Sequence, residues 1–288
     1  MPELFQYAFV QNAFLAGAVV AIVAACVGYL IVLRGQTFAV DSISHVGFTG
    51  ATAAALLGVD SLAGVFLFTL LAASGMAALG KRLRGRDVEI GMILSFVLGL
   101  GVLFISLYTQ HAAAAVNLLF GSILSVSSQD LWIIFGVSLL SLGLLAIIFR
   151  PLLFASVDPE VAEARGLPIQ AINLVFLLIQ AVTISIAIPV VGVLLVFALL
   201  VVPAAAAERL FHSPAASLAG AIAFSLASTW GGLALAFVAH GPASFFIVSL
   251  ATLFYAVARL VGYLRTPQRY QAEPHPGREV FSDATQKE

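Results

Sequence analysis

Long runs of apolar residues fill most of the chain, and polar residues gather in the short segments between these runs. Each run is close to the roughly 20 residues with which an α-helix crosses the hydrocarbon core of a bilayer. The pattern therefore predicts an all-α, polytopic bundle of about eight to nine transmembrane helices, with nine as the best count. The predicted spans are 12–33, 36–58, 60–80, 90–109, 131–149, 171–188, 190–208, 215–239 and 243–264.

The two ends of the chain depart from this pattern in different ways. No Lys or Arg precedes the first apolar run, which is more typical of a retained first span than of a cleavable signal peptide. Residues 266–288 hold seven of the 27 charged residues and three prolines, a composition that predicts a disordered tail. We therefore expect a transmembrane domain over 1–265 and a soluble tail over 266–288.

Composition narrows the class of protein further. Hydrophobic residues make up 61% of the 288 residues, charged residues make up 9%, and the mean hydropathy is +1.09. A soluble domain carries about 25% charged residues, so this chain could not cover itself with polar surface in water. Soluble enzymes and nucleic-acid-binding proteins are excluded, and membrane lipid is the expected surrounding. The single cysteine, Cys26, excludes an internal disulfide.

The basic residues indicate how the chain is oriented in the membrane. With nine spans, all thirteen Lys and Arg residues lie on one side or within the end of a span that leads there. The opposite segments, near 60, over 110–130, near 189 and near 241, contain none. Because positive charge stays on the cytoplasmic side, we expect the N-terminus outside and the C-terminal tail inside.

One segment resembles a nucleotide-binding loop but lacks a residue that such a loop needs. Residues 75–82 nearly match the phosphate-binding pattern G-x-x-x-x-G-K-[ST], yet Arg82 stands where a hydroxyl residue would hold magnesium. The glycines also lie in an apolar predicted helix rather than in a loop after a strand. If ATP drives this protein, another chain must bind the nucleotide.

The most informative polar residues lie inside the second predicted span. Asp41 and His45 are four residues apart, so in a helix they share one face. Counting about 1.5 Å per residue from Arg34 places Asp41 about 10 Å and His45 about 16 Å into the membrane. Ionisable groups at this depth are costly and usually face a polar pathway. A carboxylate and an imidazole on one face can both ligate a divalent transition metal ion, with waters or further ligands.

A simpler interpretation of Asp41 stays open at this point. Asp41 could cap a helix that begins at Ser42, with His45 as an ordinary buried and hydrogen-bonded histidine. That helix would have 17 residues as far as Gly58, about 25 Å, which barely spans a bilayer.

A second candidate site lies in the loop between the spans 131–149 and 171–188. Asp158 suits an N-cap, Pro159 suits the first helical position, and Gly166 suits the residue just after a helix. These signals predict a helix of about two turns on the cytoplasmic side, carrying Glu160, Glu163 and Arg165. The helix is either an ordinary connector or a knob that docks into a soluble partner.

Four segments together resemble the membrane permease of zinc- and manganese-type ABC importers. They are the Asp-x-x-x-His segment from Val40 to Gly50, the outer-loop segment 117–124 followed by Asp130, the loop 158–166, and the proline-containing span 191–207. The resemblance covers about 12–264. The chain departs from many zinc-type members in one place, because Ser95 stands where they carry a histidine.

The resemblance implies a fold, a set of partners and roles for the candidate residues. It implies a homodimeric permease of the type II importer fold in the bacterial cytoplasmic membrane, and no enzymatic activity in this chain. Two identical ATPase subunits would bind ATP, and an extracytoplasmic binding protein would deliver the ion. Asp41 and His45 would ligate the transported metal, which is zinc or manganese, with iron also open. Asp158, Pro159, Glu160, Glu163, Arg165 and Gly166 would form the ATPase-coupling loop.

Two other classes of protein are compatible with parts of the pattern. An ion-coupled secondary transporter would use Asp41 and His45 as proton or cation carriers and would need no ATPase. A metal-dependent intramembrane enzyme would need a fuller ligand set, such as H-E-x-x-H, which the sequence does not contain.

Overall fold

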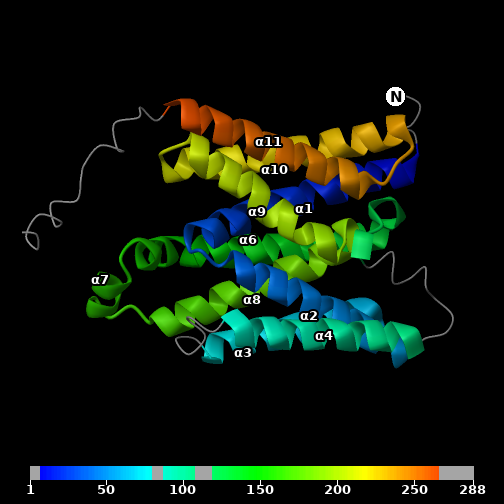
Figure 1. The fold of residues 1–288 in the computed structure, drawn as a ribbon, viewed down its shortest axis with the longest axis horizontal. Coiled ribbons are helices and arrows are strands. Elements are labelled where there is room, and N and C mark those ends of the chain that lie inside the picture. The colour runs from blue at the N-terminus through cyan, green and yellow to red at the C-terminus, as the bar shows by residue number, and fades with distance from the viewer. Residues whose placement is uncertain (1–6, 80–86, 108–118, 266–288) are drawn as a thin grey trace, which may run out of the picture.

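The computed structural model describes residues 7–79, 87–107 and 119–265 (Figure 1). Over these residues the chain is a bundle of long helices, as the apolar runs predicted. The helices are α1 Ala8–Leu33, α2 Thr37–Leu56, α3 Ser61–Leu79, α4 Asp87–Leu107, α6 Ser128–Val157, α8 Ile169–Val191, α9 Val193–Leu210, α10 Pro214–Ala239 and α11 Ala243–Arg265. Two short elements, η3 Ile123–Ser125 and α7 Pro159–Ala164, complete the set. Each of the nine predicted spans corresponds to one long helix.

Seven of the described helices are long and apolar enough to cross a membrane by themselves: α1, α3, α6, α8, α9, α10 and α11. The apolar part of α4 is shorter, Leu94–Leu107. Helix α2 is 20 residues long but carries hydroxyl residues, Asp41 and His45 among its apolar positions. The predicted second span is thus a helix of spanning length with an unusually polar composition.

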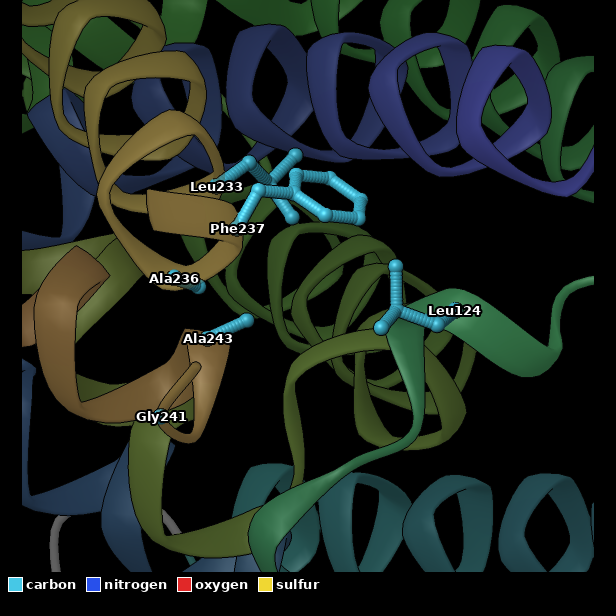
Figure 2. Close-up of a pocket in the computed structure, with 6 residues that line it drawn as sticks. All are labelled: Leu124, Leu233, Ala236, Phe237, Gly241 and Ala243. Carbon is cyan, nitrogen blue, oxygen red and sulfur yellow. The ribbon is translucent and has the colours of Figure 1, made fainter. Parts of the chain in front are cut away.

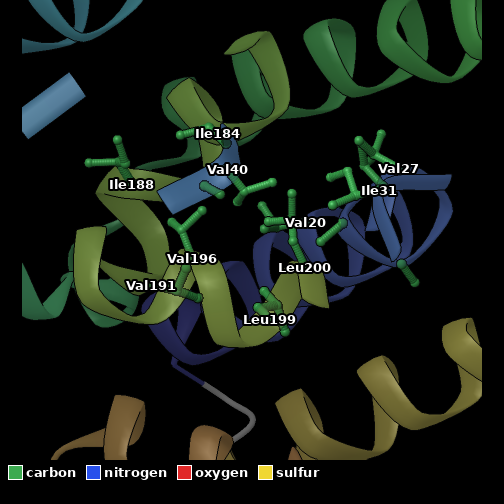
Figure 3. Packing of buried hydrophobic residues seen from close by; sticks show 14 of the residues in the cluster. Val20, Val27, Ile31, Val40, Ile184, Ile188, Val191, Val196, Leu199 and Leu200 are labelled. Carbon is green, nitrogen blue, oxygen red and sulfur yellow. The ribbon is translucent and has the colours of Figure 1, made fainter. Parts of the chain in front are cut away.

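The core of the bundle forms where α1, α2, α8 and α9 meet. Figure 3 shows Val20 and Ile31 of α1, Val40 of α2, Ile184 of α8 and Leu200 of α9 packed against one another. Small residues let the backbones approach closely in such membrane bundles. At Gly28 of α1, an added Cβ would lie 1.8 Å from the carbonyl oxygen of Leu200. This core fixes α2 against the rest of the bundle.

The bundle has two chemically distinct ends. Helix α7 lies at one end and η3 at the other, beside the start of α1 (Figure 1). The described basic residues lie toward the α7 end, at the ends of α1, α6, α7, α9 and α11: Arg34, Arg150, Arg165, Arg209, Arg259 and Arg265. Segments 80–86, 108–118 and 266–288, which hold the predicted basic loop, the first part of the outer loop and the tail, lie outside the described residues.

At the η3 end, two glycines allow the turn between α8 and α9 to cross the segment before η3. Gly121 and Gly192 both have positive φ, +74° and +88°, and each lies directly against the backbone of the other's segment. Ser122 N also donates to Pro189 O at 3.1 Å. Close by, Leu124, Leu233 and Phe237 line a small apolar cavity of about 50 Å³ (Figure 2). The lining has no metal-ligating side chain, so this cavity is not an ion site.

Candidate functional site

Helix α2 begins at Thr37, so Asp41 lies inside the helix rather than at its start. The alternative in which Asp41 caps a helix from Ser42 is therefore wrong. The reason is the turn after α1, where Gly35 adopts a positive φ of +64° and the chain re-enters a helix within three residues. Counted from Thr37, Asp41 lies about 6 Å and His45 about 12 Å along α2. Both residues therefore lie in the first half of α2.

Asp41 and His45 face each other along α2, as their spacing predicted. His45 Nε2 lies 3.5 Å from Asp41 Oδ1. The side chain of His45 is 18% exposed and that of Asp41 is 38% exposed. The other ring nitrogen, His45 Nδ1, is buried and has no hydrogen-bond partner. The pair thus has unused ligand capacity on both residues, which an ordinary buried histidine does not have.

The face of α2 that carries the pair is covered only in its second half. One turn beyond His45, Thr49 Oγ1 donates to Val97 O of α4 at 2.7 Å, and Gly101 of α4 lies against Phe48 and Thr49. One turn before the pair, Phe38 is 47% exposed. The first half of this face is therefore exposed on the surface of the single chain, and it carries the Asp41 carboxylate and the His45 imidazole.

The pair by itself is an incomplete metal site. Among the described residues, no group of three or more His, Cys, Asp or Glu side chains could hold a metal ion. Two protein ligands leave most positions around a transition metal ion unfilled. The described residues of one chain therefore supply only two of the ligands that such an ion needs.

The loop predicted to couple to an ATPase has the predicted caps. Helix α7 has Asp158 as N-cap, whose side chain accepts from Val161 N at 3.0 Å, and Pro159 in its first turn. Gly166 follows the helix with a φ of +79°, and its N–H donates to Glu163 O at 2.9 Å. Six residues make α7 slightly shorter than the predicted two turns.

Helix α7 presents charged side chains outward while a small residue anchors it. Glu160, Glu163 and Arg165 are exposed, and Ala162 is fully buried against the bundle. The Arg165 guanidinium lies 5.6 Å from the centre of the Phe154 ring in α6. The result is a polar knob held to the end of the bundle.

The outer-loop segment of the predicted motif has a structural role where it is described. Asp130 forms a reciprocal capping box with Ser127 at the start of α6, with Asp130 N donating to Ser127 Oγ at 3.1 Å. Residues 117 and 118 lie outside the described residues.

Arg34 has contacts that the sequence did not predict, because it was interpreted only as a marker of the basic side. Its Nη1 donates to Ser156 Oγ at 3.0 Å, and its Nη2 donates to Asn173 Oδ1. The guanidinium also lies 5.7 Å from the centre of the Phe176 ring. Burial lowers the pKa of Arg34, but an arginine stays charged in proteins. No local pattern reveals these partners, which are more than 100 residues away along the chain.

Comparison with known proteins identifies the family to which this chain belongs. Residues 6–262 match the ABC 3 transport family. The chain is 32% identical over 259 residues to the manganese transport system membrane protein MntC of Listeria innocua, covering 89% of this chain and 92% of that protein. It is 31% identical over 225 residues to the high-affinity zinc uptake system membrane protein ZnuB of Haemophilus influenzae, covering 77% and 86%.

A solved structure agrees with the sequence comparisons. The structure of PsaBC from Streptococcus pneumoniae in complex with Fab contains a chain that matches with a TM-score of 0.81 and 31% identity, over 93% of this chain and 95% of that one. The resemblance to zinc- and manganese-type ABC importer permeases is thus confirmed, as are the all-α importer fold and the absence of an enzyme role for this chain. The protein is a multi-pass protein of the bacterial plasma membrane and belongs to the ABC 3 transport family.

Proposed function

We propose that this protein is the permease subunit of an ATP-driven importer that carries a divalent transition metal ion, manganese or zinc, into the bacterial cell. The observation that carries the proposal is the Asp41–His45 pair on an uncovered face of α2. Ionisable groups within a membrane-spanning helix usually mark an ion path. The relatives named as manganese and zinc transport proteins support the same class of cargo.

The exposed position of Asp41 supports a homodimer in which two copies complete the metal site. In a twofold dimer the same surface patch of both copies meets at the axis. If that patch contains the first half of α2, two carboxylates and two imidazoles converge there. Manganese accepts oxygen and nitrogen ligands, and zinc favours imidazole, so this set suits either ion. Each Asp41 charge would offset part of the charge of the ion in a setting of low dielectric constant.

The two ends of the bundle indicate its orientation and the side on which an ATPase would dock. We place the α7 end in the cytoplasm, since the described basic residues gather there. This orientation puts the N-terminus outside and the C-terminal tail inside. A separate ATPase subunit would dock on α7 through Glu160, Glu163, Arg165 and the turn at Gly166. An extracytoplasmic metal-binding protein would deliver the ion at the η3 end.

Metal uptake by two variants tests the ion path. Asp41→Asn keeps the shape of the side chain and removes its charge, and His45→Ala removes the imidazole. Both variants should lose Mn²⁺ and Zn²⁺ uptake in cells that lack their own importer, while the protein is still inserted in the membrane. The matched controls are Asp60→Asn and His212→Ala, which change the same residue types in exposed segments.

Two results would contradict the proposal. Full metal uptake by both site variants at normal protein levels would remove Asp41 and His45 from the ion path. Uptake driven by a pH gradient in vesicles that hold only this chain would favour the secondary transporter.

A further inference from the structure

Arg34 connects three segments of the chain at the α7 end of the bundle. It is the C-cap of α1, and its side chain bonds Ser156 near the end of α6 and Asn173 near the start of α8. Ser156 precedes the N-cap of α7 by two residues, and Asn173 lies seven residues after Gly166. One guanidinium therefore holds both segments from which α7 projects.

The same residue is joined to the start of α2 by a short, hydrogen-bonded turn. Gly35 N donates to Val32 O and Gln36 N donates to Ile31 O, each at 3.0 Å. Gln36 in turn accepts from Gln180 Nε2 of α8 at 3.1 Å. Because this turn is three residues long and bonded at both ends, a displacement of Arg34 must move the first turn of α2. Asp41 lies one turn further along.

We propose that Arg34 is a positioning residue that transmits movement between α7 and the Asp41–His45 pair. This inference rests on the proposed function, in which α7 docks an ATPase and the pair binds the metal ion. A pull on α7 would act on Ser156 and Asn173, and these residues would move Arg34 and then the start of α2. By reciprocity, metal bound at the pair changes the equilibrium at α7 by the same factor.

The geometry of the guanidinium is what this role requires. Arginine presents a rigid fork of donors that can bond two acceptors in fixed directions, whereas lysine presents one compact and flexible charge. A residue that only marked the cytoplasmic side would need the charge alone. Arg34→Lys therefore separates the two roles, since it keeps the charge and loses the fork.

Hydrogen exchange of α7 in the full-length protein tests the proposal with Mn²⁺ alone as the probe. In the wild type, saturating Mn²⁺ should change amide exchange over 160–167 by about fivefold or more, the lower end of typical coupling between sites. Arg34→Lys should bind Mn²⁺ with unchanged affinity and lose this response. The matched control is Arg209→Lys, because Arg209 lies at the same end of the bundle, over the Tyr255 ring. It should keep the wild-type response.

A second variant tests the contact itself. Asn173→Ala with Arg34 intact should also lose the response, because it removes one of the two acceptors that the guanidinium bonds. An equal response to Mn²⁺ in wild type and Arg34→Lys would overturn the proposal, and so would Mn²⁺ binding without any response at α7. Absence of Mn²⁺ binding to the wild type would instead overturn the metal assignment, and the role of Arg34 with it.

Discussion

Replacing Gly192 by alanine should destabilise the fold by more than its backbone conformation alone explains. Gly192 has a φ of +88° and a ψ of 154°, a backbone region that is essentially restricted to glycine, and a non-glycine residue there costs about 1–3 kcal/mol. An added Cβ would also lie 2.3 Å from the carbonyl carbon of Phe120 and 2.4 Å from Gly121 N. Ordinary contact begins near 3.4 Å, so the two backbones would have to separate by about 1 Å.

A second glycine with positive φ but open surroundings gives the comparison for this steric cost. Gly58 also has a positive φ, +70°, but an added Cβ would meet nothing within 4 Å. Gly58→Ala should therefore lower the free energy of unfolding only by the cost of its backbone conformation. Gly192→Ala should cost a further 1–3 kcal/mol or so, the usual range for overpacking, because no side-chain rotation relieves a backbone contact.

Thermal unfolding of the purified protein in detergent measures the difference. Tryptophan fluorescence can follow it, since Trp132 and Trp230 lie on α6 and α10. At about 3 °C per kcal/mol for a chain of this size, the apparent Tm of Gly192→Ala should fall about 3–9 °C below that of Gly58→Ala. Equal apparent Tm values for the two variants would refute the inference that the backbones touch at this crossing.

Three further predictions concern the function of the importer. In a Cys26→Ala background, an impermeant thiol reagent added to intact cells should label a cysteine at position 60 and not one at position 163; the reverse labelling would invert the proposed orientation. Gly166→Val should lower transport and ATPase stimulation together while insertion stays normal, because valine resists the φ of +79° found there; unchanged ATPase stimulation would argue against docking at α7. Ser95→His should raise zinc uptake relative to manganese uptake, because imidazole suits zinc. Ser95 lies two residues before Val97, whose carbonyl accepts from Thr49, so along the helix axes it is about 3 Å from the level of His45. An unchanged ratio of the two uptake rates would count against this placement.

The local sequence was enough to predict the long helices and the caps of α7. Each apolar run became one long helix, because a backbone in a membrane must satisfy its hydrogen bonds internally. The Asp158, Pro159 and Gly166 signals predicted α7 correctly, since capping is an interaction between neighbours in the chain. The shared face of Asp41 and His45 followed from helical periodicity for the same reason.

The tertiary structure decided which faces are covered and which residues meet. Helices α1 and α8 are mostly buried and α6 is mostly exposed, yet all three are apolar along most of their length. Helices that are apolar all round carry no stripe that marks their buried side. The bonds from Arg34 to Ser156 and Asn173, and the contact of Gly28 with Leu200, join segments more than 100 residues apart. Only the packing of the whole bundle brings them together, because neither periodicity nor capping depends on residues so distant.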